Sequence, residues 1–130
     1  MRDTVIRPNQ EVGMSFKVAH RDDCETNGRW ELTRRTLDLQ AFGINIVNIA
    51  PGDEIPEHDE TGRDQEEVFF VISGNPTLVI DGTDCASPTG TFARIDPEHR
   101  RAARNDGEQI ASILIASAPR TSGYEPMSWA

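Results

Sequence analysis

Residues 51–74 read PGDEIPEHDETGRDQEEVFFVISG. The Pro-Gly pair that opens the stretch predicts a turn, because glycine accepts the left-handed backbone conformation that many tight turns need. A polar loop lies in the middle of the stretch, and five consecutive apolar residues, Val68–Ile72, then lead to Gly74. The stretch is therefore predicted to form a turn, an extended segment, a loop and a strand.

One imidazole and two carboxylates fall on predicted faces of this stretch. His58 and Glu60 are two residues apart, and alternate side chains of an extended segment share a face, so both are predicted to point the same way. Glu67 is in phase with Phe69 on the following strand. If these faces turn inward, His58, Glu60 and Glu67 meet in one pocket that has Phe69 in its wall.

The spacing of four residues resembles the first motif of the cupin family, which reads G-x5-H-x-H-x3,4-E-x6-G. Gly52, His58, Glu67 and Gly74 match it, with five residues between the first pair and six between the last. Glu60 stands where the family has its second histidine. Six residues separate Glu60 from Glu67, where the family usually has three or four.

A second segment resembles the second cupin motif, which ends in Pro, Gly, His and Asn. Gly90, Pro97 and Asn105 fit its frame, but the motif histidine is missing. Counting back from Asn105 puts Arg101 in the place of the histidine, and counting forward from Pro97 puts Ala102 there.

The rest of the chain alternates short apolar segments with turn residues and shows almost no helical periodicity. Short strands at such intervals predict an antiparallel sandwich or barrel. The cupin resemblance implies one such all-β architecture, a jelly-roll β-barrel or double-stranded β-helix. Residues 83–90 are predicted to form a loop, and Asp106-Gly107 a hairpin turn between the last two strands. The main predicted strands are Ile44–Ala50, Glu67–Ser73, Thr77–Ile80, Thr91–Ile95, Arg101–Asn105 and Ile110–Ala118.

A length of 130 residues predicts a single domain with one modest core. Residues 1–39 are predicted to form an N-terminal arm and the first strands, and residues 40–118 the cupin barrel core. Residues 119–130 are predicted to be a tail that packs on the barrel or on a partner subunit. Apolar side chains on an irregular tail need such a surface, and this tail carries Tyr124, Met127 and Trp129.

The formal net charge of −9 argues against a nucleic acid or an anionic membrane as the partner. No apolar run reaches the length of a membrane span, and the N-terminal residues lack the apolar core of a signal peptide. The chain is therefore predicted to be cytoplasmic. Cys24 and Cys85 form no metal-binding motif, so free thiols are predicted.

The resemblance also implies a ligand pocket inside the barrel, and its predicted wall contains His58, Glu60, Glu67, Phe69 and Arg101. Cupins commonly hold a divalent metal through three histidines and a glutamate, and only His58 and Glu67 match those positions. Glu60 could bind through oxygen, which gives a candidate metal set of His58, Glu60 and Glu67. One imidazole with two carboxylates suits Fe(II) or Mn(II), and Zn(II) is the further option.

The opposing hypothesis is an acidic pocket that holds no metal. Buried carboxylates need a cation or protons, and a fixed guanidinium can take the place of a metal. If Arg101 points into the barrel, its charge offsets that of Glu67. The pattern leaves open whether Arg101 points inward.

Two functions from different classes follow. The first is a small-molecule-binding cupin with a degenerate metal site, in which no catalytic residue is assigned. The alternative is a metal-dependent cupin enzyme of the oxygenase or isomerase type that uses His58, Glu60 and Glu67. A homodimer is expected from the resemblance and from the apolar tail, and the substrate is not indicated by the sequence.

Overall fold

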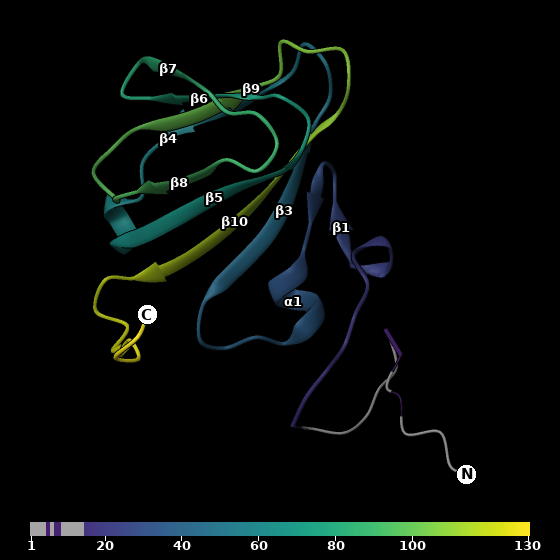
Figure 1. The fold of residues 1–130 in the computed structure, drawn as a ribbon, viewed down its shortest axis with the longest axis vertical. Helices are drawn as coiled ribbons and strands as arrows, with labels where there is room; N and C mark the ends of the chain where they lie inside the picture. The colour runs from purple at the N-terminus through teal and green to yellow at the C-terminus, as the bar shows by residue number, and fades with distance from the viewer. Residues whose placement is uncertain (1–4, 6, 9–14) are drawn as a thin grey trace.

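The computed structural model describes residues 5, 7, 8 and 15–130 (Figure 1). Its regular secondary structure is almost entirely β-strand, arranged in two antiparallel sheets, as the all-β prediction required. The predicted N-terminal arm lies partly outside the described residues. Its described part contains two short strands, a short α-helix and a 3-10 turn, and the division of the chain at residue 40 stays a prediction.

The larger sheet has six strands, and each strand runs antiparallel to its neighbours. Figure 1 shows β1 and the helix α1 beside β3, on the side of the sheet away from β8, and the C-terminus beyond the end of β10. In spatial order the strands are β1 (Thr26–Asn27), β2 (Trp30–Glu31), β3 (Gly43–Ile49), β10 (Ala111–Pro119), β5 (Gln65–Ser73) and β8 (Phe92–Ile95).

The smaller sheet has four strands, also antiparallel. In spatial order they are β4 (Glu54–His58), β9 (Arg101–Arg104), β6 (Thr77–Ile80) and β7 (Thr83–Ala86). Helix is confined, in the described part of the chain, to α1 (Thr33–Leu37) and two 3-10 turns, η1 (Arg21–Asp23) and η2 (Thr61–Arg63). No helix in that part is long and apolar enough to cross a lipid bilayer. The cytoplasmic location stays a prediction.

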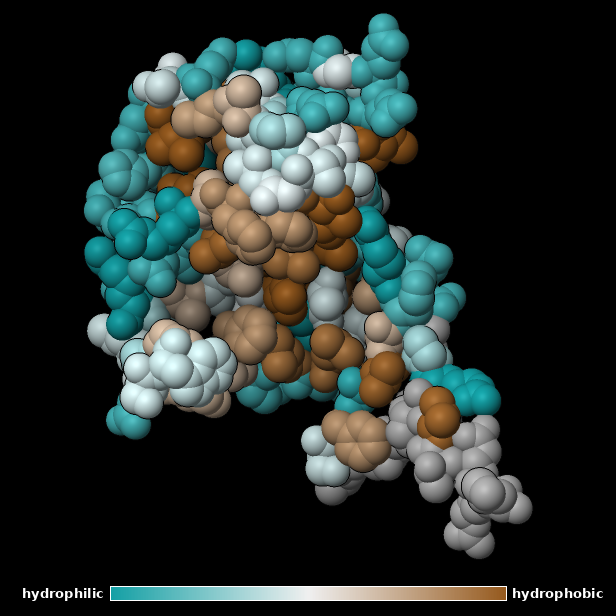
Figure 2. All heavy atoms as spheres, in the orientation of Figure 1, coloured by the Kyte–Doolittle hydropathy of each residue, from teal (hydrophilic) through white to brown (hydrophobic). Residues whose placement is uncertain are grey.

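The core lies between the two sheets, where the inward faces of their strands meet. On β5 the buried side chains are Glu67, Phe69 and Val71, and the residues between them are more exposed, as strand alternation requires. The same core cluster contains Val47, Ile49, Ile55, Leu78, Ile95 and Ile113, and Ile46 is buried as well. Figure 2 shows hydrophobic side chains gathered in the middle of the face seen in Figure 1 and hydrophilic ones along its upper and left margins.

Two local predictions are wrong. Residues 83–86 form the strand β7 and not a loop, because an edge strand needs only one pairing partner and β6 supplies it through the turn at Asp81-Gly82. Asp106-Gly107 is not a hairpin turn, because β9 and β10 belong to different sheets. At this crossing the buried Asn105 amide donates to the carbonyls of Ile49 (2.8 Å) and Gln109 (2.7 Å).

Gly74 directly follows β5, at a place where the neighbouring backbone of Ala111 leaves no room for a side chain. Its φ is +84°, and a Cβ built on it would lie 2.7 Å from the Cα of Ala111. Gly52 also has a positive φ, +81°, but nothing lies within 4 Å of a Cβ there. The two glycines therefore share a backbone requirement and differ in packing.

This difference can be measured with Gly52→Ala and Gly74→Ala in urea denaturation. Gly52→Ala should lower the free energy of unfolding by about 1–2 kcal/mol, the usual cost of a left-handed backbone at a residue with a Cβ. Gly74→Ala should cost about a further 1–3 kcal/mol, because β10 must move to relieve the overlap. Equal losses for the two variants would contradict the close packing of β5 on β10.

Candidate functional site

A cavity of about 550 Å³ opens between the two sheets. This volume lies within the range of sites that bind small molecules. One part of its lining is apolar and includes Trp30, Ile44, Phe69 and Ile115. The polar part includes His58, Glu60, Glu67, Arg101 and Ser117.

Strand pairing places the polar residues. In the smaller sheet His58, at the end of β4, lies opposite Arg101, the first residue of β9. In the larger sheet Glu67 on β5 lies opposite Ser117 on β10. Glu60 lies two residues beyond the end of β4 and directly before η2, where its carboxylate is close to both His58 and Glu67. The site is therefore assembled at the junction of the sheets.

The guanidinium of Arg101 is sealed inside the barrel. Its side chain is 1% exposed, and that of Glu67 is 9% exposed. Nη1 of Arg101 lies 3.7 Å from Oε1 of Glu67, close enough for an ion pair but too far for a hydrogen bond. Nη2 donates to the carbonyls of Ile95 (3.3 Å) and Asp96 (2.7 Å). The guanidinium is thus held by the backbone and acts on Glu67 through its charge.

Three atoms of this pair lack hydrogen-bond partners: Nε and Nη1 of Arg101 and Oε1 of Glu67. The other oxygen of Glu67 accepts a hydrogen bond of 2.8 Å from the Ser117 hydroxyl. Burial is the main influence on Glu67 and raises the pKa of its carboxyl group; the Ser117 hydrogen bond opposes this, and the charge of Glu60 adds to it. The nearby Arg101 charge lowers the pKa of Glu67, but by less than burial raises it, so the net shift is upward.

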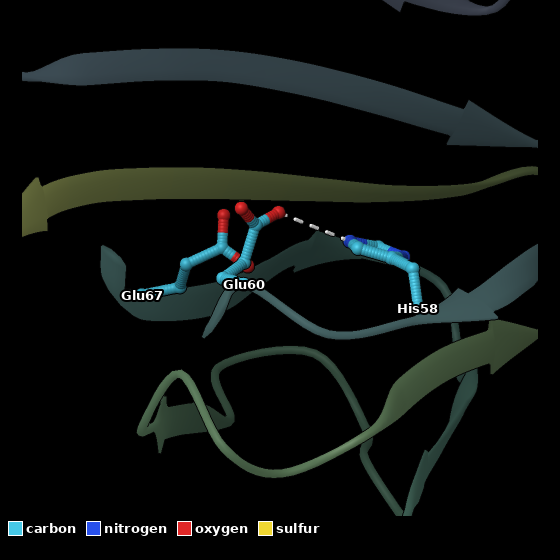
Figure 3. A group of neighbouring side chains, drawn as sticks. All are labelled: His58, Glu60 and Glu67. Carbon is cyan, nitrogen blue, oxygen red and sulfur yellow. Dashed lines mark ion pairs between the residues drawn. The ribbon is translucent and has the colours of Figure 1, made fainter. Parts of the chain in front are cut away.

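His58 pairs with Glu60 and not with Glu67. Its Nε2 lies 3.3 Å from Oε1 of Glu60, and Figure 3 shows the two carboxylates side by side with the imidazole facing Glu60. Its Nδ1 is 3.2 Å from the carbonyl of Pro56, which can only accept, so Nδ1 carries the proton. Nε2 attracts the Glu60 carboxylate only while it also carries a proton, so a metal ion would bind Nε2 only in place of that proton.

His58, Glu60 and Glu67 could hold a metal ion, since one donor atom from each lies within 4.8 Å of the others. Such a set would supply one nitrogen and two oxygens, and Arg101 lies beside the third ligand. A second group, Asp96, Glu98 and His99, is also close enough together. In that group Nδ1 of His99 already contacts the Asp81 carboxylate at 2.6 Å.

The structure brings together the five pocket residues expected from the sequence, because His58, Glu60, Glu67, Phe69 and Arg101 all line one cavity. Arg101 points inward, in phase with the buried Ala103 and Asn105, while Ala102 is only half-buried. Sequence reasoning missed Ser117, Trp30 and Asn45. Alternation along β10 could have found Ser117, because it is two residues beyond Ile115 on the cavity side.

The two sheets, the cavity between them and the inward-facing motif residues define a double-stranded β-helix. A family model for the cupin domain matches residues 45–117, more than half of the chain. The chain therefore belongs to the cupin family. A comparison with curated protein sequences gave no match.

Solved structures share this fold at low sequence identity. A cupin protein from Bacteroides fragilis is 17% identical, with a TM-score of 0.69, and the alignment covers 95% of this chain and 94% of that one. A predicted oxalate decarboxylase from Thermotoga maritima is 17% identical, with a TM-score of 0.58 and coverage of 68% and 76%. A sugar phosphate isomerase from Silicibacter pomeroyi is 20% identical, with a TM-score of 0.60 and coverage of 68% and 57%.

Substitution of Arg101 tests whether its charge is needed inside the barrel. Arg101→Ala should lower the free energy of unfolding by about 3–5 kcal/mol in urea denaturation, because it leaves Glu67 buried without its cation. Arg100→Ala is the matched control. Arg100 is exposed and pairs with Glu57 and Asp59 on the surface, so its loss should change stability little. Equal losses of unfolding free energy in the two variants would contradict a need for the Arg101 charge inside the barrel.

Proposed function

We propose that this cupin binds a small molecule in the barrel cavity and that Arg101, in place of a metal ion, balances the charge of Glu67. The observation that carries the proposal is the buried pair at 3.7 Å in the wall of a cavity of about 550 Å³. Arg101 stands where the family motif has a histidine ligand. Its charge is permanent, because guanidinium is not deprotonated in proteins.

A permanent positive charge beside Glu67 disfavours a divalent ion at the same carboxylate. The repulsion acts in a partly dry site, where it is screened less than at the surface. The guanidinium also cannot move away easily, because Nη2 is held by the carbonyls of Ile95 and Asp96. The cavity can therefore keep its shape without a metal at its centre.

A second candidate is a metal-dependent enzyme of the oxygenase or isomerase type. Its support is the proximity of donor atoms on His58, Glu60 and Glu67. One nitrogen and two oxygens suit Fe(II) or Mn(II), with Zn(II) as a further option. A bound metal would supply Lewis-acid chemistry toward a substrate oxygen. Some structural neighbours have enzymatic names, but their low identity makes them evidence for the fold alone.

Metal content separates the two candidates. Untagged protein prepared without chelator should contain much less than one transition metal ion per chain, as measured by inductively coupled plasma mass spectrometry. Arg101→His should increase affinity for Mn(II) or Zn(II), because the change adds a nitrogen donor and removes the repulsion. Arg101→Lys is the control that keeps the charge and should leave metal affinity low.

One tightly held metal ion per chain in the wild type, lost in His58→Ala, would reject the proposal. The enzyme hypothesis would then become the better supported of the two.

A homodimer completes the proposal. The tail does not bury its apolar residues on its own barrel, since Tyr124, Met127 and Trp129 are 77%, 63% and 80% exposed. The tail was predicted to pack on its own barrel or on a partner subunit, and its exposed side chains favour the partner subunit. Phe92 on the edge strand β8 is 72% exposed and stacks on Phe70, with ring centres 4.4 Å apart. An exposed apolar surface of this kind is typical of a protein–protein contact.

The contribution of the tail can be tested by ending the chain after Arg120. This truncation keeps the ion pair of Arg120 with Asp64, which is 2.7 Å long, and removes the three apolar side chains. In analytical ultracentrifugation the full chain should sediment as a dimer. The truncated chain should be monomeric at protein concentrations at which the full chain is still dimeric. Unchanged sedimentation would exclude a role of residues 121–130 in association.

A further inference from the structure

We infer that the cavity selects neutral, flat ligands that present a hydrogen-bond donor and an acceptor side by side, and that Asn45 recognises this amide-like edge. A carboxamide, a lactam and a nucleobase all carry such an edge. The inference rests on the proposed small-molecule function and names the chemical class of the ligand. Three features of the cavity support it: its charges are matched, an amide in its wall is unpaired, and its apolar wall is aromatic.

The two most deeply buried charges of the cavity wall compensate each other. Nη1 of Arg101 lies 3.7 Å from Oε1 of Glu67, and the two side chains are 1% and 9% exposed. Nε and Nη1 of Arg101 and Oε1 of Glu67 are all shielded from solvent. A ligand carboxylate that reached Arg101 would lie against Glu67, and a ligand ammonium group that reached Glu67 would lie against Arg101. Neither sign of ligand charge therefore gains from this pair.

The other charged groups of the lining stand beside an opposite charge or in water. The Glu60 carboxylate lies 3.3 Å from Nε2 of His58 and 4.0 Å from Nε of Arg63. Arg63 and Arg34 are exposed, and Arg34 also donates to the carbonyl of Leu39. Exposed cations are screened by water and salt. A charged ligand would thus lose its hydration without meeting an unpaired opposite charge, whereas a neutral ligand has no such loss.

Asn45 is an unpaired neutral group in the middle of this wall. In the larger sheet Asn45 on β3 lies opposite Ile115 on β10, which lies opposite Phe69 on β5. The three side chains therefore share one face of the sheet, and all three line the cavity. Among the residues that the structure describes, none forms a hydrogen bond with the Asn45 side chain. Asn45 is half-buried, and its amide is not sealed from solvent, so a ligand can reach it.

An asparagine amide matches a particular kind of ligand edge. Its nitrogen donates and its oxygen accepts, and the two atoms are fixed side by side. Asparagine uses both atoms in this way to contact the adjacent donor and acceptor on the edge of an adenine base. Gln40 and Gln65 also line the cavity, and each donates its amide nitrogen to a backbone carbonyl. The wall can therefore satisfy a neutral amide-like edge without using a charge.

The apolar part of the wall suits a flat ring. Trp30, Phe42 and Phe69 line the cavity together with Ile115. Aromatic side chains stack on flat heterocycles, which have apolar faces and carry their polar atoms at the edge. The cavity volume of about 550 Å³ is sufficient for such a ligand. A flat ring can therefore pack on this wall while its edge contacts Asn45.

Three probes of nearly the same shape test the inference: benzamide, benzoate and benzamidine. They are titrated calorimetrically into chelator-treated protein at neutral pH, where benzamide is uncharged, benzoate is an anion and benzamidine is a cation. Benzamide should bind at least about tenfold more tightly than either ion, because the cavity does not replace the hydration that an ion loses. If benzoate or benzamidine binds as tightly as benzamide, the inference is wrong, while the cavity remains a small-molecule site.

Substitutions of Asn45 assign the preference to its amide. Asn45→Asp keeps the size of the side chain but leaves an anion that only accepts, so benzamide should bind about tenfold more weakly and benzamidine more tightly. Asn45→Leu removes the donor and the acceptor without adding a charge, and it should weaken benzamide binding to a similar extent. Asn75→Asp is the control, because Asn75 is exposed in the loop between β5 and β6 and does not line the cavity. It should bind all three probes as the wild type does.

The possible failures are distinguishable, provided that a melting curve shows each variant to be folded. If Asn45→Asp and Asn45→Leu bind benzamide as tightly as the wild type does, this amide does not recognise the ligand and the inference is wrong. The proposed binding function would then still stand, because the probe binds. If none of the three probes binds to the wild type, both the inference and the proposed binding function fail.

Discussion

The buried charge pair of Arg101 and Glu67 joins the two sheets of this barrel. Arg101 comes from β9 in the smaller sheet and Glu67 from β5 in the larger one. At about 4 Å two opposite charges attract by on the order of 4 kcal/mol at an effective dielectric constant of about 20. Removing both from water costs several kcal/mol per ion, so the pair is sustained only with further polar contacts. The carbonyls of Ile95 and Asp96 and the hydroxyl of Ser117 supply them.

This pair decides what the rest of the cavity can present. Because two backbone carbonyls hold Nη2 of Arg101, the guanidinium stays beside Glu67 in the cavity wall, which also contains His58 and Glu60. The upward shift of the Glu67 pKa shows that burial outweighs the compensation from Arg101. The cavity lining combines two carboxylates, Glu60 and Glu67, with three arginines and an aromatic wall.

Membership of the cupin family accounts for the fold but does not choose the chemistry. The structural neighbours include a protein named as a predicted oxalate decarboxylase and one named as a sugar phosphate isomerase, and a shared barrel hosts many reactions. Beside the cupin motifs the differences are local: Glu60 stands where the first motif has its second histidine, and Arg101 where counting back from Asn105 puts the histidine of the second. Each change replaces a neutral nitrogen ligand with a fixed or titratable charge.

The sequence by itself determined the local features. The strands around β3, β5, β6, β8 and β10 and the alternation of Glu67 and Phe69 follow from period-two patterns within single segments, whereas the meeting of His58 with Glu60 and Glu67 depends on how the two sheets pack. Only the tertiary structure decided that Arg101 and not Ala102 faces inward, that residues 83–86 form a strand, and that β9 and β10 lie in different sheets. The reason is physical. Side-chain alternation is set along one strand, whereas strand register and sheet membership depend on hydrogen bonds between segments far apart in the chain.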